Sequence, residues 1–485
     1  MNTDSSKEHS NKDHNTDYAL LGFKCGIEIH QQLDGKKLFC NCPCDIKKGK
    51  PDYTVKRWLR ASAGETGEVD KAASFEQQKL KYYLYHVFKD STCLIELDEE
   101  PPMHVNQAAL NTCLKVCKLL NVTVGDQIQF MRKVVVDGSN CSGFQRTALV
   151  GRNGFITLVN GKKISIESVC LEEEACQPIE RLKTHDVYNL SRQGIPLIEI
   201  ATGPDISSAE EAKETSAKLG MILRSVDGMK RGIGTIRQDV NVSIKGGARV
   251  EIKGFQEFKS IPKVIEYEVK RHMDLIKNGK KVEMHVRGHT PDFKTVYQRP
   301  MPGASRMYPE TDIPIVLIDM SKIKTGVTLE QKETDMIHKF GLRNELAKEI
   351  VKRNIDMTGL AGKFKNIDAN FLAETIINVP KEIKSRYKKD ISVLDHLDVI
   401  EILDQGKIPK SAVFEILTEL AQGKKVDYSR YKSVDAGFVE KIVKDVVAND
   451  PDAPIGALMG QAMAKLRGKA DGKIVMELLK KYKGA

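Results

Sequence analysis

The sequence predicts an α+β fold, in which one large mixed α/β domain is followed by two small all-α domains. Short β-type runs recur between glycine-rich turns from residue 18 to about residue 320, with helical patterns between them. Residues 328–403 show helical periodicity and no convincing strand, and a Gly-Pro interruption at 406–409 precedes a second helical unit. We therefore expect a tail at 1–17, a large domain at 18–320, and helical domains at 321–405 and 406–485.

The first 17 residues contain no apolar side chain beyond Met1, which is typical of a disordered tail. They lack the apolar stretch of a signal peptide, and no later segment approaches membrane-spanning length. The ten cysteines are scattered irregularly, as in a protein with reduced thiols. We expect a cytoplasmic protein with no membrane partner. Its net charge of +10 favours an anionic partner such as RNA.

Secondary structure in the large domain follows from residue spacing. Helical spacing predicts helices at Asn106–Leu120, Ala209–Leu223 and Pro262–Ile276, and Ser208 is a suitable N-cap for the second, with Glu211 at the capping-box position. The expected β-type runs are Lys24–Ile29, Leu94–Leu97, Val134–Val136, Phe155–Val159, Leu197–Ile200 and Val250–Ile252.

Acidic residues within the β-type runs are the first chemical signal. Glu28 and His30 share one face of a strand because side chains alternate, and Glu199 is embedded among apolar neighbours. Asp239 lies on a further strand, and Leu171 precedes three consecutive glutamates. Several carboxylates with one imidazole suit Mg²⁺ or Mn²⁺. The alternative is that each carboxylate pairs with a nearby arginine.

The loop Gly138–Arg146 combines small residues with flanking cations, which suits backbone contacts to phosphate. A surface hairpin loop has the same composition, so both interpretations stay open. No G-x-x-x-x-G-K-[ST] motif occurs in the sequence, so any use of ATP does not depend on a Walker A loop.

Cys40, Cys42 and Cys44 alternate along the chain and suggest a zinc site. A structural zinc site needs four ligands, normally from two clusters, and no C-x-x-C follows. Cys93 could join the group if the fold brings it close. From this spacing we do not expect zinc.

The C-terminal region combines an amphipathic helix with a basic end. The basic residues could contact an RNA backbone, although a solvated terminus has the same composition. They are Lys465, Arg467, Lys469, Lys473, Lys480, Lys481 and Lys483.

Several long motifs together resemble the GatB/GatE family. They include GIEIHQQLDGKKLFCNC, DGSNCSGFQRT, CLEEEA, GIPLIEIATGPDI, GTIRQDVNVSIKGGARVEIKG and RMYPETDIP, in that order. The end, GALMGQAMAKLRGKADGKIVMELLKK, is similar to the family's YqeY-like tail. The resemblance implies that the large domain is a catalytic cradle and that the last domain is YqeY-like.

The details resemble the archaeal GatE branch, because RWLRASAGETGEVD stands where bacterial GatB proteins carry a second cysteine pair. Two departures are present. Only the short segment Lys277–Tyr297 stands where GatE proteins usually carry an insertion related to aspartyl-tRNA synthetases, and Glu174 replaces an aspartate of the family's L-E-E-D.

The resemblance implies phosphorylation of the γ-carboxylate of Glu-tRNA(Gln) by ATP, then amidation to Gln-tRNA(Gln). Ammonia would come from a GatD-type asparaginase-like subunit, with glutamine as amide donor, since no amidase signature is present here. The alternative is a non-catalytic tRNA-binding scaffold of the same fold. The resemblance assigns Mg²⁺ ligation to Glu28, His30, Glu173, Glu199 and Asp239, with Glu172 as the alternative to Glu173, and nucleotide or aminoacyl-end contacts to Ser142, Gln145 and Arg146.

Overall fold

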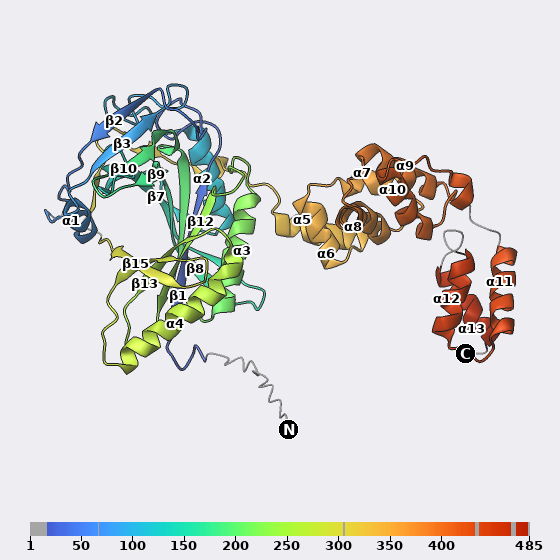
Figure 1. Ribbon diagram of the computed structural model, residues 1–485. Coiled ribbons are helices and arrows are strands. Elements are labelled where there is room, and N and C mark those ends of the chain that lie inside the picture. Colours follow the sequence, from blue (N-terminus) through green and yellow to red (C-terminus); the bar gives the residue numbers. More distant parts are fainter. Residues whose placement is uncertain (1–16, 66, 304–305, 432–435, 467–471, 484–485) are drawn as a thin grey trace. The chain divides into compact units, whose positions relative to one another are not determined.

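The computed structural model describes residues 17–65, 67–303, 306–431, 436–466 and 472–483 (Figure 1). Residues 1–16 of the expected tail lie outside the described residues, as do Arg467 and Lys469 of the basic end. The chain forms two compact units, Met1–Thr328 and Leu329–Ala485. Among the described residues, no helix is both long and apolar enough to span a bilayer.

The first unit contains a sheet of eleven strands. Its central strand β1 (Lys24–Gln32) runs antiparallel to β11 (Pro196–Thr202) on one side and to β12 (Ile236–Ser243) on the other. Beyond β12 follow β13 (Val250–Phe255), β14 (His285–His289) and β15 (Thr295–Pro300). Beyond β11 follow β8 (Lys163–Glu173), β7 (Phe144–Thr157), β6 (Phe130–Val134) and β16 (Met307–Pro309), while β4 (Thr123–Val124) pairs with β7.

Three helices pack on one face of this sheet: α2 (Gln107–Leu119), α3 (Ala209–Arg224) and α4 (Ile261–Lys277) (Figure 1). The main hydrophobic core lies between the helices and the strands and contains Ile27 and Ile29 of β1. Because side chains alternate along a strand, Glu28 and His30 point to the opposite face. The hydrophobic pattern of β1 therefore directs Glu28 and His30 away from the core.

A smaller sheet has the order β2 (Tyr53–Arg57), β3 (Tyr82–Val87), β10 (His185–Asn189) and β9 (Gln177–Arg181). The buried rings of Tyr83, Tyr85 and Tyr188 form its core with neighbouring apolar residues. The remaining elements of the unit are α1 (Lys71–Gln77) and the paired strands β5 (Gln127–Ile128) and β17 (Val316–Leu317).

The three predicted helices of this unit are confirmed, and so is the N-cap of α3, where the Ser208 side chain accepts a hydrogen bond from the Glu211 backbone N–H. The expected strand at Leu94–Leu97 is wrong, because this segment forms consecutive turns. The Glu96 carboxylate accepts a hydrogen bond from the Cys93 N–H at 2.6 Å, and this local contact competes with strand pairing.

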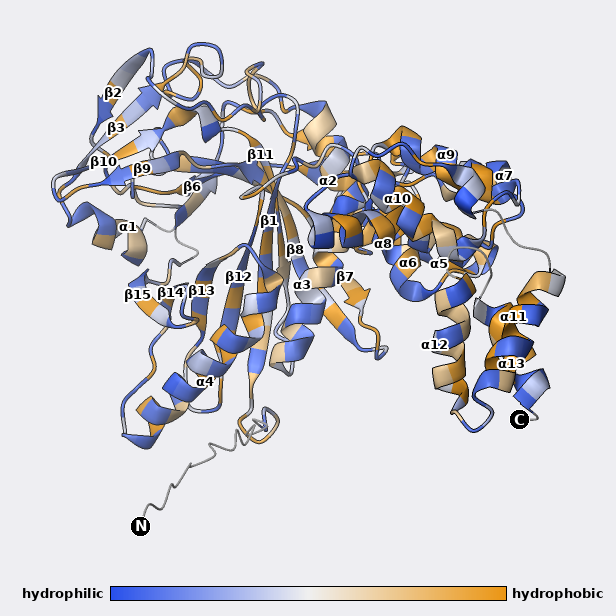
Figure 2. Cartoon of the chain, turned by 45° about the vertical axis from the view of Figure 1, so that its right-hand side comes forward, coloured by the Kyte–Doolittle hydropathy of each residue, from blue (hydrophilic) through white to orange (hydrophobic). Residues whose placement is uncertain are grey.

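Among its described residues, the second unit contains helices joined by turns and loops and no strand, as expected. One core joins side chains from residues 342–431, and a separate core joins side chains from residues 439–479. Figure 2 shows hydrophobic and hydrophilic residues interspersed along these helices. The helices are α5 (Leu329–Phe340), α6 (Asn344–Lys352), α7 (Met357–Lys363), α8 (Ala369–Tyr387), α9 (Val393–Asp404), α10 (Val413–Ala421), α11 (Ala436–Asn449), α12 (Ile455–Leu466) and α13 (Gly472–Lys483).

The domain boundary expected at 405/406 falls between α9 and α10, which contribute to the same core. Ile400 and Leu403 before this point pack in one cluster with Val413 and Ile416 after it. The change from one core to the next lies between Tyr431 and Val439. A Gly-Pro interruption therefore marks a turn within one helical core here.

Candidate active site

A cavity of about 490 Å³ opens on the face of the main sheet opposite the three helices. Its charged lining comes from seven strands, from helix α1 and from loops beside them. The acidic residues include Glu28, Glu172, Glu174, Glu199 and Glu251, and the basic residues are His30, Lys133, Arg237, Arg249, Lys253, Arg299 and Arg306.

Two carboxylates converge on one imidazole at the centre of the cavity. The Nε2 atom of His30 lies 3.3 Å from Oε1 of Glu28 and 3.3 Å from Oε2 of Glu199. Burial alone would lower the pKa of His30, but its hydrogen bonds to Glu199 and Glu28 raise that pKa well above the ordinary value. Burial would raise the pKa of Glu199, but Lys133 and His30 hold it well below the ordinary range. Both pKa shifts favour an imidazolium beside a carboxylate as long as no cation takes the place of the proton.

A second acidic group shares Glu28. Ligand atoms of Glu28, Asp239 and Glu251 all lie within 4.8 Å of one another. The Lys253 ammonium lies 2.7 Å from Oδ2 of Asp239 and also contacts Glu251. Burial would raise the pKa of Asp239, but Lys253 lowers it. Asp239 therefore favours the ionised form beside its strand partner Glu28, although it is buried and is not among the residues that line the cavity.

Three consecutive glutamates of the β8 end occupy three different environments. Glu172 lines the cavity and accepts a hydrogen bond from the Lys133 ammonium at 2.7 Å. Glu173 points to the opposite face, where Arg146 contacts it through its backbone N–H at 3.2 Å and its guanidinium at 3.5 Å. Glu174 lines the cavity again. The structure thus brings Glu172, and not Glu173, together with Glu28, His30 and Glu199.

Glu174 is held by a two-pronged ion pair. Arg237 donates to Oε2 at 2.7 Å and to Oε1 at 3.1 Å, and the Gln32 amide donates to Oε2 at 2.8 Å. Burial would raise the pKa of Glu174, but Arg237 lowers it to about 2. This glutamate anchors the wall of the cavity, and its oxygens are already engaged.

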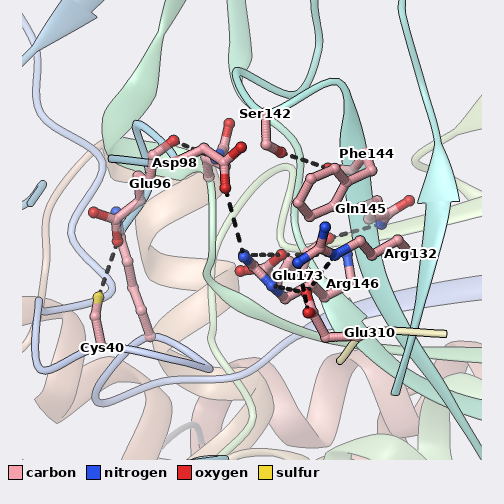
Figure 3. A network of polar contacts seen from close by, with 12 residues as sticks. Cys40, Glu96, Asp98, Arg132, Ser142, Phe144, Gln145, Arg146, Glu173 and Glu310 are labelled. Atoms are coloured by element: carbon pink, nitrogen blue, oxygen red, sulfur yellow. Dashed lines mark hydrogen bonds and ion pairs between the residues drawn. The ribbon is translucent and has the colours of Figure 1, made fainter. Parts of the chain in front are cut away.

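The three residues expected to contact nucleotide separate in the structure (Figure 3). Gln145 lines the cavity, where its side-chain amide donates to the Glu173 carbonyl at 2.7 Å. Arg146 is buried on the other face and contacts Glu310 at 2.8 Å. The Ser142 hydroxyl donates to the Phe144 carbonyl at 2.8 Å, and Ser142 does not line the cavity. Only Gln145 is placed for a contact with a ligand in this cavity.

The chain matches known sequence families over most of its length. Residues 23–324 match the GatB/GatE catalytic domain, and residues 342–482 match the GatB domain. The chain belongs to the GatB/GatE family. The family resemblance seen in the motifs is thereby confirmed, and the mixed α/β domain with the large sheet is its catalytic domain.

Curated relatives in the GatB/GatE family carry the name of the E subunit of glutamyl-tRNA(Gln) amidotransferase. The proteins of Methanocaldococcus jannaschii, Archaeoglobus fulgidus and Methanosarcina barkeri are 35%, 34% and 33% identical to this chain. Each alignment covers 96% of this chain and 98–99% of the relative. The first alignment spans 623 positions, more than the 485 residues of this chain, so that relative contains sequence that this chain lacks.

The donor set of this GatB/GatE cavity fits a hard divalent cation. It offers carboxylate oxygens with one imidazole, and no thiolate is among the grouped ligand atoms of Glu28, His30 and Glu199. Nε2 of His30 is the ring atom that faces Glu28 and Glu199, so a cation bound there would replace the proton between the imidazole and these carboxylates. A cation held by Glu28, His30, Glu199 and their neighbours would neutralise carboxylates that otherwise depend on lysines.

Sequence reasoning missed several residues of the cavity. Glu251 and Lys253 occur two apart on β13, and this alternation could have placed both on the site face. Lys133 stood out only as a cation flanking a loop. Arg299 lies on β15, a strand that the sequence analysis did not expect, and Arg306 directly precedes the short strand β16.

Proposed function

We propose that this chain is the ATP-using, tRNA-binding subunit of an amidotransferase that converts Glu-tRNA(Gln) into Gln-tRNA(Gln). The observation that carries the proposal is the arrangement of charge in the cavity. Arg249, Arg299 and Arg306 line it, and none has a carboxylate within ion-pair distance among the described residues. Three arginines without carboxylate partners beside an acidic cluster suit a triphosphate with its divalent cation.

The proposed reaction answers a chemical difficulty. A carboxylate is a poor acyl electrophile because oxide would have to leave. Transfer of the γ-phosphoryl group of ATP to the γ-carboxylate of the esterified glutamate releases ADP and gives an acyl phosphate. Ammonia then attacks the carbonyl carbon, inorganic phosphate leaves, and one proton is released as the amide forms.

Each group of residues has a role in this proposal. Glu28, His30, Glu172, Glu199 and Asp239 would hold Mg²⁺, with Mn²⁺ as an alternative ion, and Glu173 drops out because it faces away. When bound, Mg²⁺ would neutralise part of the negative charge of the phosphate groups. The arginines would bind the phosphates. Lys133 lowers the pKa of Glu199 and Lys253 lowers that of Asp239, so both carboxylates favour the ionised form.

Ammonia has to come from a partner. Because its relatives are named as one lettered subunit of an amidotransferase, this chain would act in a heteromeric complex with a GatD-type asparaginase-like subunit that releases ammonia from glutamine. The complex would act on Glu-tRNA(Gln). The net charge of +10 favours such an anionic substrate.

A non-catalytic tRNA-binding scaffold is the second candidate. Buried carboxylates that need lysine partners add nothing to RNA binding, so their presence supports an enzyme. The test is ATP hydrolysis by the complex with uncharged tRNA(Gln) and with Glu-tRNA(Gln). Hydrolysis that requires the esterified glutamate, with Gln-tRNA(Gln) as product, supports the proposal. Tight tRNA binding without any ATP turnover would instead support the non-catalytic scaffold.

A further inference from the structure

Four potential metal ligands meet at a second place in the first unit, away from the acidic cavity. They are the thiols of Cys40, Cys42 and Cys93 and the carboxylate of Glu96, and their ligand atoms all lie within 4.8 Å of one another. None of these residues lines the cavity. Cys40 and Glu96 are buried, and Cys42 and Cys93 are half-buried. Cys44 remains outside the group, although it continues the alternation of Cys40 and Cys42.

Two separate turns bring the ligands together. The turn after β1 is closed by hydrogen bonds from the Lys37 N–H to the Cys42 carbonyl and from the Cys44 N–H to the Gly35 carbonyl, both at 2.9 Å. The second turn spans Cys93 to Glu96, where the carboxylate accepts from the Cys93 N–H at 2.6 Å. This is a C-x-C turn facing a C-x-x-E turn.

The spacing of the ligand atoms fits a tetrahedral ion. Bonds of about 2.3 Å from zinc to sulfur and about 2.1 Å to oxygen place neighbouring ligands about 3.5–3.8 Å apart. The four atoms lie within 4.8 Å of one another, and Cys40 Sγ already lies 2.9 Å from Glu96 Oε1 (Figure 3). Shifts of about an ångström or less would place all four around one ion.

The charge near the cluster also suits a metal. Three thiolates and one carboxylate around a divalent ion leave two negative charges. The buried Lys37 ammonium lies 3.1 Å from Oε1 of Glu96 and removes one of them. Its nitrogen has no hydrogen bond of good geometry among the described atoms, so it is free to adjust as the carboxylate turns toward an ion.

We propose that Cys40, Cys42, Cys93 and Glu96 form a structural zinc site. The C-x-C turn supplies two of the four ligands, and the fold supplies the other two, Cys93 and Glu96, from the turn at 93–96. Four protein ligands close the coordination sphere, which is typical of a structural zinc. Thiolate ligands select zinc over Mg²⁺. The site does not depend on the proposed amidotransferase function.

The site would join the turn that follows β1 to the turn before Asp98. Asp98 approaches the Arg146 guanidinium at 3.9 Å, within the network that also holds Glu173 (Figure 3). β1 carries Glu28 and His30 into the cavity. Zinc would therefore stabilise two segments that support the acidic cavity from outside it, without contact with substrate.

The test is metal content of the full-length protein, purified without chelator or metal-affinity resin and dialysed against zinc. Plasma mass spectrometry should find about one zinc ion per chain. Cys93→Ser and Glu96→Gln should lower zinc affinity by at least about tenfold, whereas Cys44→Ser, the neighbouring cysteine outside the cluster, should leave it unchanged. Alkylation of Cys42 and Cys93 in the wild-type protein should be slow with zinc and fast after chelation.

The alkylation measurement keeps the proposal testable if a variant does not fold. Wild-type protein without zinc after dialysis overturns the site. Equal alkylation of Cys42 and Cys93 with and without zinc also overturns it. Unchanged zinc affinity in Glu96→Gln, or a loss in Cys44→Ser equal to that in Cys93→Ser, overturns the assigned ligand set.

Discussion

His30 of β1 and Glu199 of β11 are direct partners across two antiparallel strands, and the imidazole Nε2 lies 3.3 Å from a carboxylate oxygen of Glu199. On the other side of β1, Glu28 is the direct partner of Asp239 in β12. The register of three strands thus assembles four ionisable groups. A substitution of any one of these side chains should therefore change the electrostatic environment of the other three.

Glu28→Gln and Asp239→Asn should each reduce ATP-dependent amidation by about 100-fold or more, because each removes a charge that would hold the divalent cation. Affinity for tRNA should change little, since neither side chain is part of a basic surface. Single-turnover formation of Gln-tRNA(Gln) and a tRNA binding assay measure the two effects, with circular dichroism as a control for folding. Wild-type turnover in both variants would refute the metal assignment.

The neighbours Glu172 and Glu173 should give opposite phenotypes. Glu172→Gln changes a residue that faces the cavity and should abolish turnover in the molecules that remain folded. Glu173→Gln leaves the buried Arg146 with one carboxylate fewer, so it should lower the free energy of unfolding by about 1–3 kcal/mol. Turnover per folded molecule should remain. Urea denaturation measures the effect on stability and an activity assay measures the effect on turnover. Loss of turnover in Glu173→Gln, with turnover retained in Glu172→Gln, would instead assign Glu173 to the cation site.

Arg299→Ala should raise the KM for ATP by roughly 10- to 150-fold, because it removes one charge-assisted contact to phosphate, worth about 1.5–3 kcal/mol. Arg152→Ala is the matched control, since Arg152 is exposed and does not line the cavity. Initial rates at varied ATP concentration measure the change. Equal KM values for both variants and the wild type would exclude Arg299 from the nucleotide site.

The Glu174–Arg237 pair predicts a pH dependence of stability. The pKa of Glu174 is about 2 in the folded protein against an ordinary value of 4.5, so the unfolded chain binds more protons between these values. The stabilisation, roughly 3 kcal/mol, is present above pH 4.5 and is lost as the pH falls toward 2. Glu174→Gln should therefore flatten the fall in unfolding free energy over this window, measured by urea titration at several pH values. If the curves of unfolding free energy against pH were parallel for the variant and the wild type, the Glu174–Arg237 pair would not be the source of this pH dependence.

The position of a truncation should decide whether the helical unit survives. A chain ending after Gln405 removes α10 from a core shared with α9 and should unfold that unit. A chain ending after Tyr431 keeps this core, loses the core at 439–479 and should remain helical with weaker tRNA binding. Each lost phosphate contact should reduce the slope of log affinity against log salt by about 0.7–0.9. Unchanged slopes would mean that the basic end is only solvated.

The sequence predicted the fold class, the three long helices of the catalytic domain and the alternation of β1, because each depends on local spacing. It placed Glu28 and His30 on one strand face, and the strands of Glu199 and Asp239 proved to be the neighbours of that strand. It could not choose between Glu172 and Glu173, because the choice depends on which face of β8 meets the helices. The turn at Leu94–Leu97 was missed because the carboxylate of Glu96 bonds to its own loop.

Partners distant in sequence could not be predicted either. Lys133 contacts Glu172, and Glu310 contacts Arg146, although the partners are far apart in sequence. Only the order of the strands in the sheet brings them together. The domain boundary expected at 405/406 differs from the structure for the same reason, because it depends on contacts between residues distant in sequence. Gly and Pro interrupt a helix, but only packing shows whether one core continues past the interruption.

The three glutamates at the end of β8 have a consequence for how this strand can evolve. Substitution of one acidic residue by another changes reach but leaves each side chain on its own face. Deletion or duplication of a single codon before Glu172 would instead exchange the faces, turning Leu171 or Glu173 toward the cavity and sending a charge into the apolar side. Individual residues of β8 can therefore be substituted during evolution. The number of residues in the strand cannot change by one, because this would exchange the two faces of the strand.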